Sequence, residues 1–184
     1  RMFRRERQLL AALDHPNIAR LIDGGVTAQG LPYLVLEYVD GVPITQYCRD
    51  QRTSLRERVR LAGDVCRAVE HAHRAMIVHR DIKPANVLVT AEGVVKLLDF
   101  GVAKLLQADN YRTQTVDAFM TPEYAAPEQV RRGGDSPALD VYALGVVLHE
   151  LILGVRPERH SPMRPSRLIT PSTATVADPS TLRR

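Results

Sequence analysis

The chain has 184 residues, of which 45% are hydrophobic and 25% charged, the balance of one ordinary globular domain with its own core. It contains no run of 18 uncharged apolar residues and no apolar block behind its arginine-rich start, so neither a membrane span nor a signal peptide is expected. Six of the 25 basic residues but only two of the 21 acidic ones follow Gly154, so the net charge of +4 belongs to a proline-rich tail and argues against a nucleic-acid-binding face.

The first part of the chain predicts one helix and two strands. Leucines on one face indicate a helix over residues 3–13, and Pro16 ends it. Strands are expected over Ile18–Val26 and Tyr33–Val39, joined by a turn at Gly30.

Two helices are predicted next, a short one over Ile44–Asp50 and a long one over Leu55–Ala75. Ser54 is a suitable N-cap for the long helix, with Glu57 as its capping-box partner. The buried stripe of this helix is expected to contain Val59, Ala62, Val65, Cys66 and Val69.

A loop over Met76–Asn86 leads to short strands at Val87–Val89 and Val94–Leu97. The last predicted element is an apolar helix over Asp140–Leu153, which Gly154 ends.

Four motifs follow one another in the second half of the chain. Residues 79–86 read His-Arg-Asp-Ile-Lys-Pro-Ala-Asn, residues 99–101 Asp-Phe-Gly, residues 121–128 Thr-Pro-Glu-Tyr-Ala-Ala-Pro-Glu, and residues 140–145 Asp-Val-Tyr-Ala-Leu-Gly. Each motif alone is weak, but together and in this order they resemble the protein kinase family, over most of the chain.

The resemblance implies an α+β, protein kinase-like fold. A partial N-lobe of one helix and two strands is expected over residues 1–39, and a mostly helical C-lobe over residues 40–157. A flexible tail rich in Pro, Ser, Thr and Arg is expected over residues 158–184.

The residue types suit phosphoryl transfer, which needs a positioned hydroxyl and neutralised phosphate charge. By resemblance, Asp81 orients the substrate hydroxyl or accepts its proton, and Lys83 puts positive charge beside the transferred phosphate. Asn86 and Asp99 would supply oxygen ligands for Mg²⁺. Lys83 together with Thr121 resembles the serine/threonine branch. The alternative, in which the two aspartates are surface-loop acids, makes the ordered set of motifs a coincidence.

The resemblance also implies a nucleotide site. Leu36 would be the gatekeeper, the backbone of Glu37 and Val39 would hydrogen-bond adenine, and Leu88 would pack beneath the base. Glu6 matches the helix glutamate that pairs with a strand lysine in kinases.

The glycine-rich phosphate loop and the lysine partner of Glu6 have no match in the sequence. No glycine precedes Gly24 and no lysine precedes Lys83, so both features are expected upstream of Arg1 in a longer protein. The proline-rich sequence that follows the last predicted helix leads us to expect that the final C-lobe helices are lost or cut off. The isolated chain is therefore expected to bind ATP poorly.

Several side chains keep two interpretations. Asp140 is expected to cap its helix, to brace the catalytic-loop backbone, or both. Arg80 resembles the arginine that receives a phosphate on the activation segment; Thr113 and Thr115 are the nearest candidates for it, unless they are solvated loop residues.

The remaining candidates are assigned to packing. His71 and His73 are two residues apart on a helix and point to nearly opposite faces, so they are expected to pack or face solvent instead of sharing a metal ion. The two cysteines, Cys48 and Cys66, are expected to be reduced, buried thiols. An apolar spine is expected from His79, Phe100, Leu10 and Leu21.

The resulting prediction is a serine/threonine protein kinase of the bacterial eukaryotic-like type. It would transfer the γ-phosphate of ATP, with Mg²⁺, to a Ser or Thr hydroxyl of a protein substrate in the cytoplasm, without nucleic acid or membrane contact from this segment. A pseudokinase is the alternative, although Asp81, Lys83, Asn86 and Asp99 are all intact. A small-molecule kinase fits less well, because the segment with Thr121 would form a peptide-binding ledge.

Overall fold

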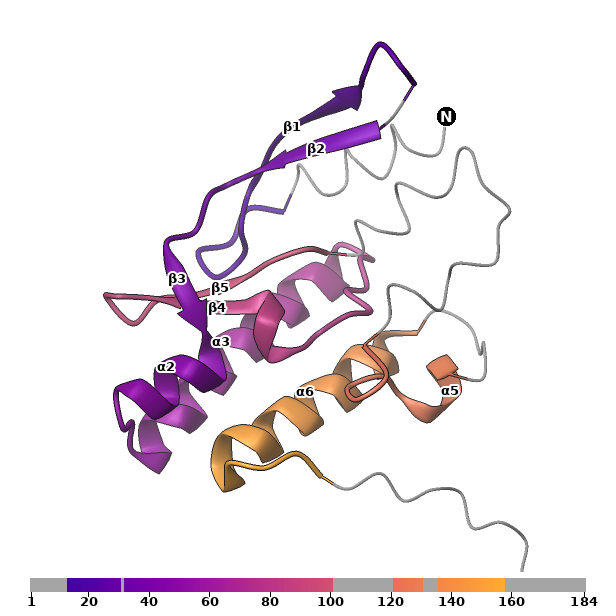
Figure 1. Ribbon diagram of the computed structural model, residues 1–184. Helices are drawn as coiled ribbons and strands as arrows, with labels where there is room; N and C mark the ends of the chain where they lie inside the picture. The colour runs from indigo at the N-terminus through magenta and orange to yellow at the C-terminus, as the bar shows by residue number, and fades with distance from the viewer. Residues whose placement is uncertain (1–12, 31, 101–120, 131–135, 158–184) are drawn as a thin grey trace, which may run out of the picture.

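The computed structural model describes residues 13–30, 32–100, 121–130 and 136–157, which form two small sheets and a layer of helices. Strands β1 (Leu21–Val26) and β2 (Pro32–Leu36) form an antiparallel pair, and strands β3 (Gly41–Pro43), β4 (Val87–Thr90) and β5 (Val95–Leu97) form an antiparallel sheet in the order β3-β4-β5. In Figure 1 the β1–β2 pair lies at one end of the molecule and the helices at the other, with the second sheet between them. This arrangement has the expected α+β character.

The helical layer is built around two long helices that pack side by side. They are α3 (Leu55–Arg74) and α6 (Pro137–Leu153), accompanied by α2 (Ile44–Asp50), the short α5 (Pro127–Val130) and a 3₁₀ turn, η1 (Pro84–Asn86). Within the described ranges, no helix is both long enough and apolar enough to cross a membrane.

Local capping signals set the ends of the long helices. Ser54 Oγ accepts a hydrogen bond from Glu57 N at 3.2 Å, as predicted, while the Glu57 carboxylate pairs with Arg60. Ser136 caps α6 in the same way by accepting from Ala138 N, and Gly154 ends that helix with a φ of 74°.

The predicted buried stripe of α3 was partly wrong. Ala62, Val65 and Val69 are buried, but Val59 is 49% exposed and Cys66 is also exposed, so only Cys48 is a buried thiol. The buried face of the helix also includes four positions that the sequence analysis did not predict: Leu61, Asp64, Ala68 and Ala72. The spacing of apolar residues predicted the buried side of the helix, but it could not predict which positions α6 and the sheet would cover.

Strands β1, β2 and β5 are shorter than predicted, β4 extends one residue further to Thr90, and one strand was missed. The ladder of β1 and β2 begins at Leu21 and ends at Leu36, so Val39 lies outside it. Gly41, predicted to lie beyond a strand end, begins β3 and pairs with Thr90. A Cβ atom there would come within 2.8 Å of Val89 O, so this pairing depends on glycine.

Strand β5 joins the two sheets through the segment before β1. Ala19 N donates to Leu97 O at 2.9 Å, and Leu97 N donates to Asn17 O at 2.8 Å. These bonds run beside Ile18, which forms a parallel bridge with Leu97, and both side chains are buried. The β1–β2 pair is thereby fixed to the strand that leads to Asp99.

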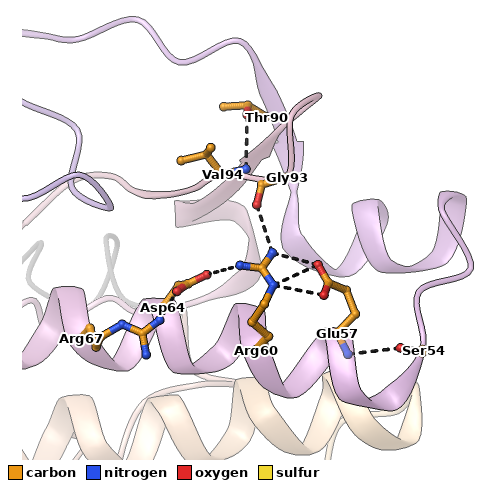
Figure 2. A network of polar contacts seen from close by, with 8 residues as sticks. All are labelled: Ser54, Glu57, Arg60, Asp64, Arg67, Thr90, Gly93 and Val94. Atoms are coloured by element: carbon orange, nitrogen blue, oxygen red, sulfur yellow. Dashed lines mark hydrogen bonds and ion pairs between the residues drawn. The ribbon is translucent and has the colours of Figure 1, made fainter.

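Helix α3 is tied to the β4–β5 turn by one arginine. Figure 2 shows the Arg60 guanidinium between the Glu57 and Asp64 carboxylates, at 2.8 Å from each, with a further bond of 3.3 Å to Gly93 O. Arg67 binds the other oxygen of Asp64. These ion pairs on α3 orient Arg60, and its hydrogen bond to Gly93 O connects the β4–β5 turn to the helix.

Candidate active site

Asp140 organises the loop that carries the predicted catalytic residues. It lies in the first turn of α6, is 1% exposed, and its carboxylate accepts from His79 N at 2.8 Å and from Arg80 N at 2.7 Å. The predicted brace is thus confirmed. Capping of α6 falls instead to Ser136, because the helix begins three residues earlier than expected.

The brace holds Arg80 in a strained backbone conformation. Its φ is +70°, a region that costs a non-glycine residue free energy. The peptide groups on either side of this residue are held: Arg80 N donates to Asp140, and Arg80 O accepts from Gln129 Nε2 at 2.8 Å. The loop geometry is therefore imposed jointly by α6 and the segment that precedes it.

His79 connects this loop to the strand before Asp99. Its buried ring lies 2.7 Å (Nε2) from Leu98 O, and its Nδ1 accepts from Asp81 N at 3.3 Å. The ring also contacts Phe100, with centroids 4.8 Å apart, which confirms that these two spine residues are neighbours. Burial lowers the pKa of His79, so the imidazole is neutral at pH 7.

Three of the predicted site residues meet at the Asp81 carboxylate, and a fourth, Thr121, is reached through Lys83. Lys83 Nζ lies 2.7 Å and Asn86 Nδ2 3.0 Å from the same oxygen, Oδ2. Lys83 also donates to Thr121 Oγ1 at 2.7 Å, which links the catalytic loop to the segment that contains Thr121. Both of these contacts to the Asp81 carboxylate are made by Oδ2, not by Oδ1.

The two predicted metal ligands flank adjoining strands: Asn86 ends η1 directly before β4, and Asp99 follows β5. Asn86 O accepts from Leu98 N at 2.9 Å, so the residue before Asp99 is bonded directly to Asn86. Asn86 uses its amide nitrogen toward Asp81, which leaves its side-chain oxygen as a donor to a cation. Asp99 is exposed, with a φ of +55°.

These two oxygen donors fit Mg²⁺, which takes one or two protein ligands and completes its shell with phosphate and water. In the described part of the chain no group of three or more His, Cys, Asp or Glu side chains is placed to hold a metal ion by itself. Such a cation would therefore depend on the oxygens of a bound phosphate.

One of the predicted nucleotide residues shares a small pocket with a predicted metal ligand. Leu36 and Asp99 line the same small pocket, together with Leu21 and Phe100. Glu37 N donates to Arg20 O at 2.8 Å, so the carbonyl of Glu37 is its remaining backbone group. Val39 follows β2, and the partly buried Leu88 lies on β4.

Some predictions fall outside the described residues. They are Glu6, Leu10, the helix over residues 3–13, the threonines at 113 and 115, and the tail over residues 158–184.

The sequence alone missed four residues that shape the site. His73, assigned to packing, has Nε2 at 2.7 Å from Asp140 Oδ2, whereas His71 stacks against His15 at 5.2 Å between centroids. Gln129 Nε2 donates a hydrogen bond to Arg80 O. The Tyr124 hydroxyl donates to Glu150 at 2.6 Å, and burial raises the pKa of this phenol. Lys96 pairs with Glu37. Each contact joins distant parts of the chain, so no local pattern could have indicated it.

Comparison with known proteins agrees with this geometry. The family model described as "Protein kinase domain" matches residues 1–173, and the chain belongs to the protein kinase family.

Among its relatives, the serine/threonine-protein kinase PknB of Mycobacterium leprae is 39% identical over 159 residues, covering 84% of this chain and 26% of the relative. The serine/threonine-protein kinase PknA of Mycobacterium tuberculosis is 44% identical over 160 residues, covering 84% of this chain and 37% of the relative. The chain thus spans about a quarter to a third of the curated relatives that it matches.

Proposed function

We propose that this chain carries the phosphoryl-transfer centre of a serine/threonine protein kinase, which moves the γ-phosphate of ATP to a Ser or Thr hydroxyl of a protein. The observation that carries the proposal is the cluster in which Lys83 and Asn86 both contact Asp81 Oδ2 while Lys83 reaches Thr121. Kinases share this arrangement of an acceptor carboxylate, a cation and an amide.

Asp81 acts on the substrate hydroxyl. Its Oδ2 is fixed by two donors, so the carboxylate has one orientation and presents Oδ1 to the acceptor. A positioned carboxylate of this kind orients the hydroxyl for in-line attack and takes its proton as the bond to phosphorus forms.

Lys83 and Thr121 tie substrate binding to chemistry. The Lys83 ammonium lies between Asp81 and Thr121, where it can stabilise negative charge on the transferred phosphoryl group. Thr121 belongs to the segment next to the acceptor, so its bond to Lys83 keeps that segment in register with Asp81.

The family uses ATP, and Asn86 and Asp99 are the residues that would hold its Mg²⁺. When bound, the ion neutralises phosphate charge. Adenine would pack on Leu88, with Leu36 as the gatekeeper, and hydrogen-bond to the backbone of Glu37 and Val39. Glu6 would pair with the lysine that contacts the phosphates. A nucleotide-rich, reducing compartment suits this chemistry and the free Cys48 thiol, so we place the domain in the cytoplasm.

Two substitutions in the native polypeptide test the proposal. Asp81→Asn removes the proton acceptor but keeps the shape of the side chain, so kcat should fall by about 10²- to 10⁴-fold while the Kd for Mg-ATP stays near that of the wild type. Asp99→Ala should instead weaken binding of Mg-ATP, measured by calorimetry, while binding of metal-free nucleotide changes little.

Asp50→Asn is the matched control, since it removes an exposed carboxylate at the end of α2. The proposal is wrong if Asp81→Asn transfers phosphate to a protein at the wild-type rate.

A further inference from the structure

Lys96 forms an ion pair that the catalytic cluster does not use. Its Nζ lies 2.8 Å from Glu37 Oε1, and the two side chains are 18% and 32% exposed. The other oxygen of Glu37 accepts from Arg20 N at 3.1 Å. The hydrogen bond from Lys96 lowers the pKa of Glu37, so the Glu37 carboxylate is ionised at pH 7.

This pair differs from an ordinary surface ion pair, which contributes little. The pair between Arg74 and Glu70, for example, joins side chains that are 76% and 60% exposed. Glu37 is held through both carboxylate oxygens and also through its backbone, because Glu37 N donates to Arg20 O. Because Glu37 is held at several atoms, a change in the position of Lys96 would also move Glu37. An exposed ion pair such as that of Arg74 and Glu70 can change its geometry without moving its neighbours.

The two ends of the pair lie at different parts of the proposed nucleotide site. Lys96 is directly opposite Leu88 in the β4–β5 ladder, and such cross-strand neighbours project from the same face of a sheet. That face is where Leu88 would support the base. Glu37 immediately follows Leu36, where the β1–β2 ladder ends and the segment proposed to hydrogen-bond adenine begins.

Lys96 also precedes Asp99 by three residues on the same stretch of chain. A rigid connection from Glu37 to β5 therefore relates the base to the cation ligand. The backbone supplies one such route, from Glu37 through Arg20 and Ala19 to Leu97. The ion pair supplies a second route, and it acts directly on the side chain of Glu37.

We propose that Lys96 is a positioning residue of the nucleotide site: its bond to Glu37 holds the adenine-binding segment at a fixed distance from the Leu88 face and from Asp99. The proposal rests on the proposed function. Preorganisation of this kind lowers the cost of ordering a segment when ligand binds. Its loss should therefore appear in nucleotide affinity and not in the phosphoryl-transfer step.

The test compares Lys96→Met with Lys96→Arg in the native polypeptide. For Lys96→Met we expect the Kd for ATP, measured by calorimetry with and without Mg²⁺, and the KM for ATP to rise about tenfold, with kcat at saturating ATP within about twofold of the wild type. Lys96→Arg keeps the charge and the donor, so it should bind nucleotide nearly as the wild type does. The double substitution Glu37→Lys with Lys96→Glu should recover part of the affinity that either single change loses.

Arg74→Met is the matched control, because it removes an exposed ion pair on α3 and should leave the Kd for ATP unchanged. The Lys96 proposal is overturned if Lys96→Met and Arg74→Met bind ATP equally well, or if Lys96→Met lowers kcat without changing the Kd. It is also overturned if Lys96→Arg is as impaired as Lys96→Met, a comparison that remains valid should the methionine variant fold poorly.

Measurements on the wild type distinguish failure of the proposed function from failure of the Lys96 proposal. If it binds no Mg-ATP, the proposed function fails and the Lys96 proposal fails with it. If it binds Mg-ATP and Asp81→Asn blocks transfer, while Lys96→Met binds normally, only the Lys96 proposal fails.

Discussion

His79 is held as a neutral imidazole by its two hydrogen-bond partners. Nε2 faces the carbonyl of Leu98, so it must carry the proton, and Nδ1 faces the N–H of Asp81, so it must accept. If Nδ1 were also protonated, its N–H would face the N–H of Asp81, and two hydrogen-bond donors would point at each other. Geometry and burial therefore favour the same state, and burial lowers the pKa of His79.

This state predicts a loss of stability in mild acid. An unfolded histidine has a pKa of about 6.5. Because the folded pKa of His79 is lower, the unfolded chain binds more protons, and the free energy of unfolding should fall as pH drops below about 6.5. Urea unfolding between pH 5 and 8 measures this slope.

Replacing His79 with Gln, which does not titrate, should reduce the slope even though it lowers stability overall. His15, whose pKa is also lowered by burial, contributes in the same direction, so part of the slope should remain. Gln51→Ala, at an exposed position after α2 that carries no titrating group, is the control and should leave the slope unchanged. An identical slope in His79→Gln and wild type would refute the assignment.

Asp140 and Ser136 allow bracing and capping to be separated within one helix. Asp140→Ala leaves the amides of His79 and Arg80 without their charged acceptor, so the free energy of unfolding should fall by about 3 kcal/mol and turnover should drop as the loop relaxes. Ser136→Ala removes only a cap and should cost about 1 kcal/mol with kcat unchanged. Chemical denaturation and steady-state kinetics measure both effects. Equal effects of the two substitutions on kcat would show that Asp140 has no role beyond helix stability.

At the scale of elements, the sequence predicted what local patterns determine. The span of α2, the cap at Ser54 and the end of α6 at Gly154 follow from residues within a few positions of each other. Strand β3 has only three residues, and its existence depends on pairing with β4, which is far away in sequence. It could not be recognised from its own composition.

The candidate site shows the same division. The types and order of Asp81, Lys83, Asn86 and Asp99 indicated the chemistry, because kinase motifs combine a catalytic group and its neighbours in short stretches. His73 supports the loop from 67 residues before its partner Asp140, and Lys96 reaches Glu37 across 59 residues. Supporting residues of this kind become visible only when the chain is folded.

Arg60 provides a test of how α3 holds the β4–β5 turn (Figure 2). Arg60→Ala removes two carboxylate contacts and the bond to Gly93 O, all partly exposed, so the free energy of unfolding should fall by about 1 kcal/mol. Hydrogen exchange of the amides around Gly93 should become faster. Arg56→Ala, on an exposed part of the same helix, is the control for lost helix charge. Equal exchange in the two variants would mean that Arg60 does not fasten the turn.

At the scale of the whole molecule, β5 is the element that joins the other parts. Its backbone binds the segment that leads into β1, and Lys96 reaches the end of β2. The next residue after the strand, Leu98, is bonded to both His79 and Asn86. The residues proposed to bind the adenine base, the cation and the substrate hydroxyl are thus connected through one short strand. The hydrogen bonds and the ion pair of this strand decide whether the two sheets move together.

Asn17 is the attachment whose removal tests this role of β5. Its side-chain amide donates to Val95 O at 2.9 Å, and its own carbonyl accepts from Leu97 N. Asn17→Ala keeps the backbone bond but removes the side-chain bond and leaves the Val95 carbonyl without that donor, which should cost about 1 to 2 kcal/mol. Because the lost bond joins the β1–β2 pair to β5, hydrogen exchange should accelerate over Ile18–Val26 and stay unchanged in α3 and α6. Gln29→Ala, in the exposed β1–β2 turn, is the control; acceleration spread evenly over the molecule in Asn17→Ala would show that the two sheets unfold as one unit and that this bond does not govern their connection.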